Sequence, residues 1–272
     1  MLRALRTERG FTVEQVAEQL LCSPSKVSRM ETGQRGATAR DIRDLCDLYG
    51  VTDPAERDHL ARLAAEGKLQ GWWQSYELEF ATYVGLEEAA ESIKDFSPSI
   101  VMGLVQTRRY ARAMHERGWQ DFEPDRIDEL VEVRMRRQRL LSRNPPLSLH
   151  LVLEEVVLRR VVGGPAVMAE QLDRLVELAE MPHITIQVMP NEAGAHPAMG
   201  SNFTMLEFGG AASDVVYVEG LVGWLYLERQ QDLKRYYRVF ERLCQIALNQ
   251  RESIEMISEI AAFYKSAAVS ES

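Results

Sequence analysis

The chain has 272 residues, of which 46% are hydrophobic and 27% are charged, a balance that supports one large globular domain or two smaller ones. Its formal net charge is -9, and its three cysteines include no CxxC pair, which argues against a disulfide framework and a zinc site. No stretch approaches the roughly 20 consecutive apolar residues that cross a bilayer. We therefore expect a protein of the reduced cytoplasm with no membrane span.

Positive charge gathers at the start of the chain. Residues 1–43 contain eight basic and five acidic residues, whereas the rest of the sequence is net negative. Binding to nucleic acid depends on the potential at the contacting face rather than on the total charge. The acidic composition therefore does not exclude a DNA-binding segment in this part of the chain.

Apolar residues recur at helical spacing through residues 1–66 and predict an all-α domain of five short helices. Gln15 follows its expected N-cap by three residues, which is the capping-box pattern. Pro24 stands at the first position of the third helix, where its missing N–H is not needed. The five helices are expected to begin near Leu2, Thr12, Ser23, Thr38 and Asp53.

The second and third of these predicted helices form a helix-turn-helix. The stretch SPSKVSRMETG over 23–33 turns Val27 and Met30 inward and leaves small polar and basic side chains outside, a surface that the DNA major groove admits. Glu31 is expected to pair with a nearby arginine. We predict base contacts from Ser25, Lys26, Ser28 and Arg29, with phosphate as the alternative for Lys26, and phosphate contacts from Thr12, Gln15, Arg35 and Arg40.

Residues 2–66 resemble the XRE family of helix-turn-helix regulators, the phage Cro/repressor type. The resemblance rests on small Ala17 where the two helices cross, on Leu20 and Cys22 beside the turn, and on the run SRMETGQR. That family usually has glycine in the turn, where this chain has Leu21. A non-glycine residue with positive φ costs about 1 kcal/mol, so either the turn is rearranged or the strain is tolerated.

A domain boundary is predicted near 67–71, where two glycines interrupt the helical pattern before a pair of tryptophans. The second domain, over 72–265, is expected to be α+β, with one small sheet covered by helices. Its predicted helices lie over 86–96, within 103–118, and over 124–143, 165–180, 229–247 and 250–265. Its predicted strands lie over 147–153, 183–189, 203–209 and 214–220, with a further candidate over 223–228.

Most of this second domain resembles the C-terminal domain of WhiJ-type regulators from high-GC bacteria. The resemblance rests on the segments GWWQSY, YVGLEEAA, VMGLVQTRRYARAM, NEAGAHPAMGSNFTMLEF and DVVYVEGLVGWLYLE. It implies an antitoxin-like regulator whose gene lies beside one for a small partner protein, and it implies no particular ligand.

Three residues of the second domain are candidate contacts for a ligand or partner: Trp72, Trp73 and His196. The adjacent tryptophans suit an aromatic binding face or buried anchors at a domain junction. His196 lies in the loop 191–200, which is rich in turn-forming residues and is either a contact loop or a structural one. The basic run RMRRQR over 134–139 is either a solvated helix face paired with neighbouring acids, such as Glu132 with Arg136, or a second phosphate-contacting patch.

The sequence contains no GxSxG, no phosphate-binding glycine loop and no dinucleotide fingerprint, and no histidine has metal-ligand spacing. We therefore expect no enzyme, no cofactor and no metal. The predicted function is a transcription regulator that reads specific sites on double-stranded DNA and whose second domain binds a small partner protein or a small-molecule effector. The alternative is an antitoxin-like protein-interaction scaffold with little sequence-specific reading of DNA.

A single recognition helix buries little surface, so specific binding needs two half-sites about 34 Å apart and predicts a homodimer. The dimer is expected to form through the second domain or through the amphipathic last helix. Ile254, Ile257, Ala261 and Tyr264 line one face of that helix.

Overall fold

The computed structural model divides the chain into two units, residues 1–79 and 80–272, and each is described by itself. The division lies beyond the boundary predicted near 67–71. The structure describes residues 2–31, 36–66, 71–76, 78–118, 122–210 and 213–270.

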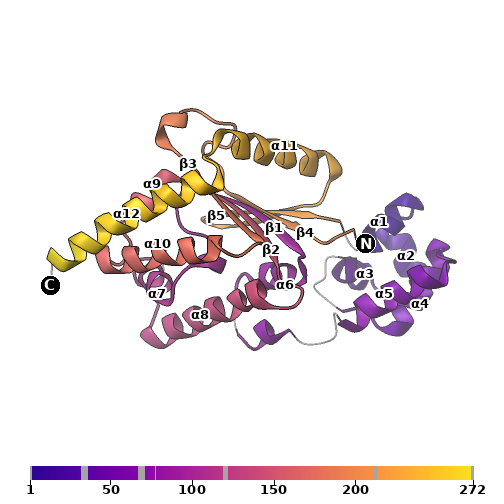
Figure 1. Cartoon of the computed structure of the whole chain (residues 1–272). Coiled ribbons are helices and arrows are strands. Elements are labelled where there is room, and N and C mark those ends of the chain that lie inside the picture. Colours follow the sequence, from indigo (N-terminus) through magenta and orange to yellow (C-terminus); the bar gives the residue numbers. More distant parts are fainter. Residues whose placement is uncertain are drawn as a thin grey trace. The chain divides into compact units, whose positions relative to one another are not determined.

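The first unit contains the five predicted helices. They are α1 (Leu2–Glu8), α2 (Val13–Gln19), α3 (Pro24–Glu31), α4 (Ala39–Tyr49) and α5 (Pro54–Glu66), followed by the short 3-10 helix η1 (Trp72–Ser75). The apolar positions that the helical spacing assigned inward form one core, which includes Val16, Ala17, Val27, Met30, Ile42 and Leu45. An all-α domain around a helix-turn-helix is therefore confirmed for this unit (Figure 1).

Side chains cap these helices where the sequence predicted caps. The Thr12 hydroxyl accepts the Gln15 N–H at 3.2 Å, and the Gln15 side chain accepts the Thr12 N–H at 2.8 Å. The Ser23 hydroxyl accepts the Lys26 N–H at 3.2 Å at the start of α3. Each cap satisfies a backbone donor that the helix itself leaves without a partner.

The second unit is built on one mixed sheet of six strands, in the order β3-β2-β1-β4-β5-β6. Strand β1 runs parallel to β2 and antiparallel to β4, and β2 runs parallel to β3. Strands β4, β5 and β6 form an antiparallel set at the other end. The strands are β1 (Ser92–Ser97), β2 (Ser148–Glu154), β3 (Ile184–Met189), β4 (Phe203–Glu207), β5 (Val215–Gly220) and β6 (Gly223–Leu227).

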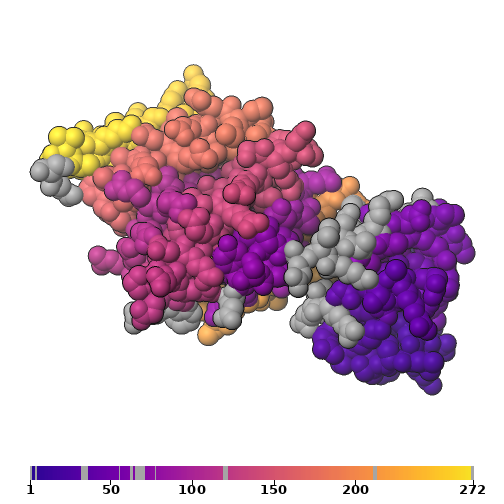
Figure 2. Space-filling view, turned by 90° about the horizontal axis from the view of Figure 1, so that it is seen from below, coloured from indigo at the N-terminus to yellow at the C-terminus, as the bar shows by residue number. Residues whose placement is uncertain are grey.

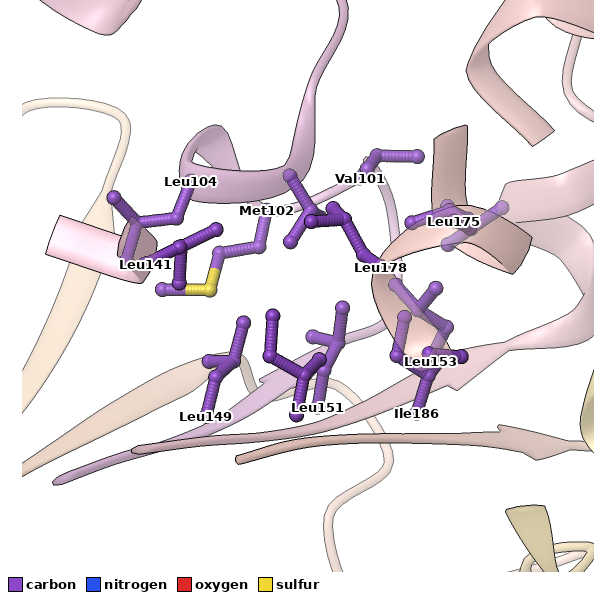
Figure 3. Close-up of a cluster of buried hydrophobic side chains, with 14 of the residues drawn as sticks. Val101, Met102, Leu104, Leu141, Leu149, Leu151, Leu153, Leu175, Leu178 and Ile186 are labelled. Carbon is purple, nitrogen blue, oxygen red and sulfur yellow. The ribbon is translucent and has the colours of Figure 1, made fainter. Parts of the chain in front are cut away.

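Alternating side chains divide the core of this unit into two layers, because successive residues of a strand point to opposite faces. From β2, Leu149, Leu151 and Leu153 enter the larger cluster, whereas Val152 enters the cluster on the other face. Figure 3 shows these leucines pointing from one face of the sheet toward the residues that cover it. Leu104 and Leu141 lie at one end of this face, and Leu175 and Leu178 of α10 (Pro165–Ala179) lie at the other end.

Helix α11 (Gln230–Ile246) covers the second face, where its Leu233, Phe240 and Leu243 pack on Phe203 and its neighbours. The short 3-10 helix η4 (Asn191–Ala193) also joins the cluster on the second face, through Ala193. On the side of the first face lie α6 (Ala81–Ala89), α7 (Arg108–Glu116), α8 (Pro124–Arg137), α9 (Glu155–Arg159), α10 and α12 (Gln250–Ser270), with the 3-10 helices η2 (Gly103–Val105) and η3 (Gln138–Ser142). Figure 1 shows the sheet between α11 above it and α6, α8 and α10 below it, and Figure 2 shows, from below, the outer surface of the segments drawn in magenta. The predicted α+β class, a sheet covered by helices, is confirmed.

One predicted helix, over 86–96, is wrong. Helix α6 ends at Ala89, and residues 92–97 form β1, which lies between β2 and β4 in the middle of the sheet. The strand escaped notice because it carries the charged residues Lys94 and Asp95, each of which has a partner on β4. Lys94 pairs with Glu207 of β4, and the Thr204 hydroxyl donates to Asp95 at 2.6 Å.

The last helix does not offer the apolar face that was predicted for dimerisation. Ile257, Ala261 and Tyr264 of α12 are at most 4% exposed and belong to the large core cluster together with α10 and β3. The Tyr264 hydroxyl also donates to the Arg159 carbonyl at 2.7 Å. This face is used inside the unit, so a dimer needs another surface.

Candidate nucleic-acid interface

The turn between α2 and α3 brings Leu21 into the left-handed region, with φ of 50°. It is the one non-glycine residue with positive φ in the described part of the chain, and its side chain is 94% exposed. Of the two predicted alternatives, the structure contains the strained turn. The Cys22 N–H still reaches the Ala17 carbonyl at 2.9 Å, so the turn closes tightly beneath Leu21.

The outward face of α3 presents Ser25, Ser28 and Arg29, all of them exposed, while Val27 and Met30 are buried. The Arg29 guanidinium folds back along its own helix and donates to the Ser25 carbonyl at 3.1 Å. The Ser25 hydroxyl lies 3.0 Å from that of Ser23. This face carries small polar groups and one long cation, the side-chain types that read base edges in a major groove.

Lys26 is held differently from its neighbours. Its ammonium lies 2.6 Å from Asp41, the third residue of α4, and its side chain is 26% exposed. Burial opposes the charge of Asp41, but hydrogen bonds from Lys26 and from Thr38 lower the pKa of this carboxyl to about 2. Lys26 thus joins α3 to the start of α4, a role that sequence reasoning missed.

The C-terminal end of α3 is fixed by a second ion pair. Arg6 of α1 binds both carboxylate oxygens of Glu31, at 2.6 and 3.1 Å, and also donates to the Phe11 carbonyl at 2.7 Å. Its hydrogen bonds to Glu31 raise the pKa of Arg6. The predicted pairing of Glu31 with an arginine is confirmed, and the structure identifies the partner.

The predicted phosphate contacts come from several segments of the first unit. Thr12 and Gln15 lie at the start of α2 and use their hydroxyl and carbonyl oxygens in the capping box, which leaves the Gln15 amide nitrogen to donate. Arg40 is 83% exposed, 3.5 Å from Asp44. Arg35 and Gly33 lie outside the described residues. The base and phosphate contacts themselves stay predictions.

Fold and surface together define the first unit as a helix-turn-helix module, and a family model of a helix-turn-helix domain matches residues 1–60. This match indicates a DNA-binding regulator. Residues 80–259 match the model of a domain of unknown function, DUF5753, and the chain belongs to that family. No curated protein and no solved structure matches the chain.

The two adjacent tryptophans lie in η1 and are half-buried, with their ring centroids 5.9 Å apart in an edge-on arrangement. Tyr76 adds a third ring, 6.0 Å from Trp72. Glycine at position 71 lets the Trp73 ring lie close to the backbone, because a Cβ atom there would lie 2.3 Å from that ring. Trp72 and Trp73 therefore pack on their own segment, and their role as ligand contacts stays a prediction.

His196 lies inside its loop rather than on the loop surface. Its side chain is 3% exposed, its Nε2 lies 3.1 Å from Glu154, and its ring meets that of Phe96 edge-on at 5.5 Å. The neighbouring residue Pro197 faces outward and lines a groove. His196 is thus placed to hold the loop 191–200 in position.

The basic run over 134–139 is partly buried, which neither of its predicted alternatives anticipated. Arg137 binds both oxygens of fully buried Glu87 at 2.6 and 2.8 Å, beneath the rings of Phe80 and Tyr83. Burial opposes its charge, but Glu87 raises the pKa of Arg137. Arg134 donates to Gln106 at 2.5 Å. Arg137 is therefore held in the interior, and Arg134 is half-buried.

Among the described residues, no three or more His, Cys, Asp or Glu side chains form a cluster that could hold a metal ion. Within the same residues, none of the helices has the length and apolar character needed to cross a membrane.

Proposed function

We propose that this protein is a sequence-specific, DNA-binding transcription regulator of the cytoplasm that inserts α3 into the major groove. The observation that carries the proposal is the exposed face of Ser25, Ser28 and Arg29 on a helix tied at both ends. A recognition helix must present its side chains in one fixed geometry for bidentate base contacts to discriminate. The ion pairs of Lys26 and Glu31 supply that fixed geometry.

The proposal is tested by selecting duplexes from a random library with the full chain and then measuring binding of the selected and scrambled duplexes. Arg29→Ala should cost about 1–3 kcal/mol on the selected duplex and relax the preference at one position. Arg43→Ala, which removes an exposed arginine of α4, is the matched control and should leave the preference unchanged. Equal binding of selected and scrambled duplexes by the wild-type chain would instead favour the scaffold alternative.

The same proposal includes a homodimer, because two half-sites need two recognition helices. We propose the β5–β6 hairpin as the surface that contacts the second copy. Strand β6 is the edge of the sheet, and Leu221, Val222, Trp224 and Leu225 are between 40% and 104% exposed. An exposed strand edge offers unpaired backbone groups to the edge of another chain.

Sedimentation of the full chain with and without DNA tests the dimer. Leu225→Lys should shift the chain toward monomer, because it places a charge on the edge strand. Phe263→Lys on α12 changes an apolar residue that is 67% exposed and should leave the assembly unchanged. A wild-type monomer in both conditions would contradict this part of the proposal.

We further propose that the second unit regulates DNA occupancy by binding a small partner protein or a small-molecule effector. The proposal is supported by the size of this unit, which has its own two-layered core beyond anything the helix-turn-helix requires. Co-purification from the native host, followed by identification of bound DNA, protein and small molecules, separates the two versions. Recovery of a stable partner without any DNA would favour the antitoxin-like scaffold.

A further inference from the structure

The exposed side of α11 carries a row of cations in a unit that is otherwise acidic. Residues 80–272 contain 28 acidic and 21 basic residues, yet Lys234, Arg235, Arg238 and Arg242 all lie exposed on this helix. At 3.6 residues per turn they fall within an arc of about 100° that contains no acidic residue. Among the described residues, none of the four forms an ion pair with a carboxylate, and Arg242 donates a hydrogen bond to Gln245 at 3.2 Å.

These side chains border an open groove of about 550 Å³ between α11 and the loop 191–200. Pro197 and Val239 complete its lining, together with Gln231. The opposite side of α11 is anchored in the core through Leu233, Phe240 and Leu243. Both walls of the groove are therefore fixed before any ligand arrives.

The loop wall is fixed by the contacts beneath it. His196 is held between Glu154 and Phe96, and Ala198 is 3% exposed in the core cluster under α11. The two residues on either side of Pro197 are thus buried, which leaves Pro197 at the surface as a rigid border. A groove with such walls needs little reorganisation when it binds.

The arrangement of the charges favours an extended polyanion over a small anion. Lys234, Arg238 and Arg242 follow each other at four-residue intervals, which places them about 6 Å apart along the helix axis. All four cations come from one helix and cannot surround a compact ligand. A chain of regularly spaced phosphates can contact each of them in turn.

We propose that this groove binds the phosphate backbone of duplex DNA, as a second contact beside the one made by α3. The inference rests on the proposed function, because the helix-turn-helix brings a duplex into the neighbourhood of the second unit at high effective concentration. Such contacts add affinity without reading sequence. The basic surface that the sequence suggested for α8 is thus assigned to α11.

The test is the salt dependence of duplex binding by the full chain. Lys234→Gln, Arg238→Gln and Arg242→Gln are combined, since glutamine keeps the helix propensity. Loss of three phosphate contacts should make the slope of log affinity against log salt less negative by up to about 2.7. The affinity lost between about 50 and 200 mM salt then becomes up to about 40-fold smaller. The preference for the selected duplex should not change.

The matched control removes the same charge elsewhere. Arg108→Gln, Arg109→Gln and Arg251→Gln are exposed arginines of the second unit that face Glu132, Glu170 and Glu255. This combination should leave the slope at the wild-type value. Equal slopes for the two triple variants would overturn the proposal. The proposal would also be overturned if the α11 variant lost binding to poly-L-glutamate while its duplex slope stayed at the wild-type value. The groove would then be a site for acidic polypeptide.

The two proposals can fail separately. If the wild-type chain does not distinguish selected from scrambled duplex, sequence-specific reading by α3 is wrong. The slope on the scrambled duplex then still decides whether the α11 groove contacts phosphates. Thermal unfolding of both triple variants checks that they are folded, which is expected for substitutions at exposed positions.

Discussion

Helices α3 and α8 both read as basic segments, yet they use their arginines in opposite ways. On α3, Arg29 is exposed while buried or half-buried ion pairs hold the helix at its ends. On α8, Arg137 turns inward to Glu87, and Arg134 reaches Gln106. The difference shows that a basic stretch of sequence does not by itself predict a basic surface, because Arg137 is buried against a distant acid whereas Arg29 is exposed.

The largest expected effect concerns the buried pair of α8. Glu87→Gln leaves the Arg137 guanidinium in the interior without its counter-charge and should lower the free energy of unfolding by about 3–5 kcal/mol. Urea unfolding followed by circular dichroism measures this. Glu170→Gln removes an acid that is 41% exposed beside Arg109, and should cost less than about 1 kcal/mol. Similar losses for both variants would contradict an interior role for Arg137.

A smaller effect is expected at the pair that supports α3. Glu31→Gln keeps the size of the side chain but removes the charge opposite Arg6, whose side chain is 11% exposed. We expect a loss of about 2 kcal/mol, together with weaker binding to the selected duplex. If stability falls but duplex binding of the folded protein is unchanged, the pair does not position the recognition helix.

The third effect depends on pH and concerns Asp41, whose pKa of about 2 lies below its ordinary value of 3.8. A carboxyl with a lowered pKa stabilises the fold above its ordinary pKa, and that contribution is lost as pH falls through the folded value. Asp41→Asn should therefore cost about 1–2 kcal/mol at neutral pH, and the difference from wild type should vanish between pH of about 4 and 2. If the stability difference between the variant and wild type persists at pH of about 2, the charge of the Asp41 carboxylate beside Lys26 does not cause it.

The smallest expected effect is a gain of stability at the turn. Leu21→Gly relieves the positive φ of a residue that is 94% exposed, and should raise the free energy of unfolding by about 0.5–1 kcal/mol. Leu21→Ala keeps the strained backbone and removes the same exposed side chain, so it serves as the control. Equal stabilities of the two variants would mean that the turn is not strained.

Local patterns were sufficient where a structure depends on neighbours in the chain. The helix starts at Thr12, Ser23 and Thr38 follow from side chains that cap donors three residues away. The strands β2 and β3 follow from alternation that a single segment displays. The helix-turn-helix, with its inward Val27, could therefore be predicted almost residue by residue.

Local patterns failed where the deciding partner is far away in sequence. Lys94 of strand β1 pairs with the Glu207 carboxylate, and these two residues are 113 positions apart in the sequence. Arg137 lies 50 positions from Glu87. Local periodicity cannot predict pairs that are so far apart in the sequence. For the same reason, the sequence predicted a DNA contact for Lys26 but not its ion pair with Asp41. The basic row on α11 could have been found from the sequence, because Lys and Arg gather on one face of this helix and its acidic residues lie outside that face.

The attachment of α3 at both ends has a thermodynamic consequence for association. Because Arg6 and Asp41 already hold the helix in the free protein, the entropy of ordering it is spent during folding rather than on binding. Calorimetry of the protein with its selected duplex should then give a heat-capacity change of the size expected for docking a preformed surface. The more negative heat-capacity change that accompanies coupled folding should not be observed.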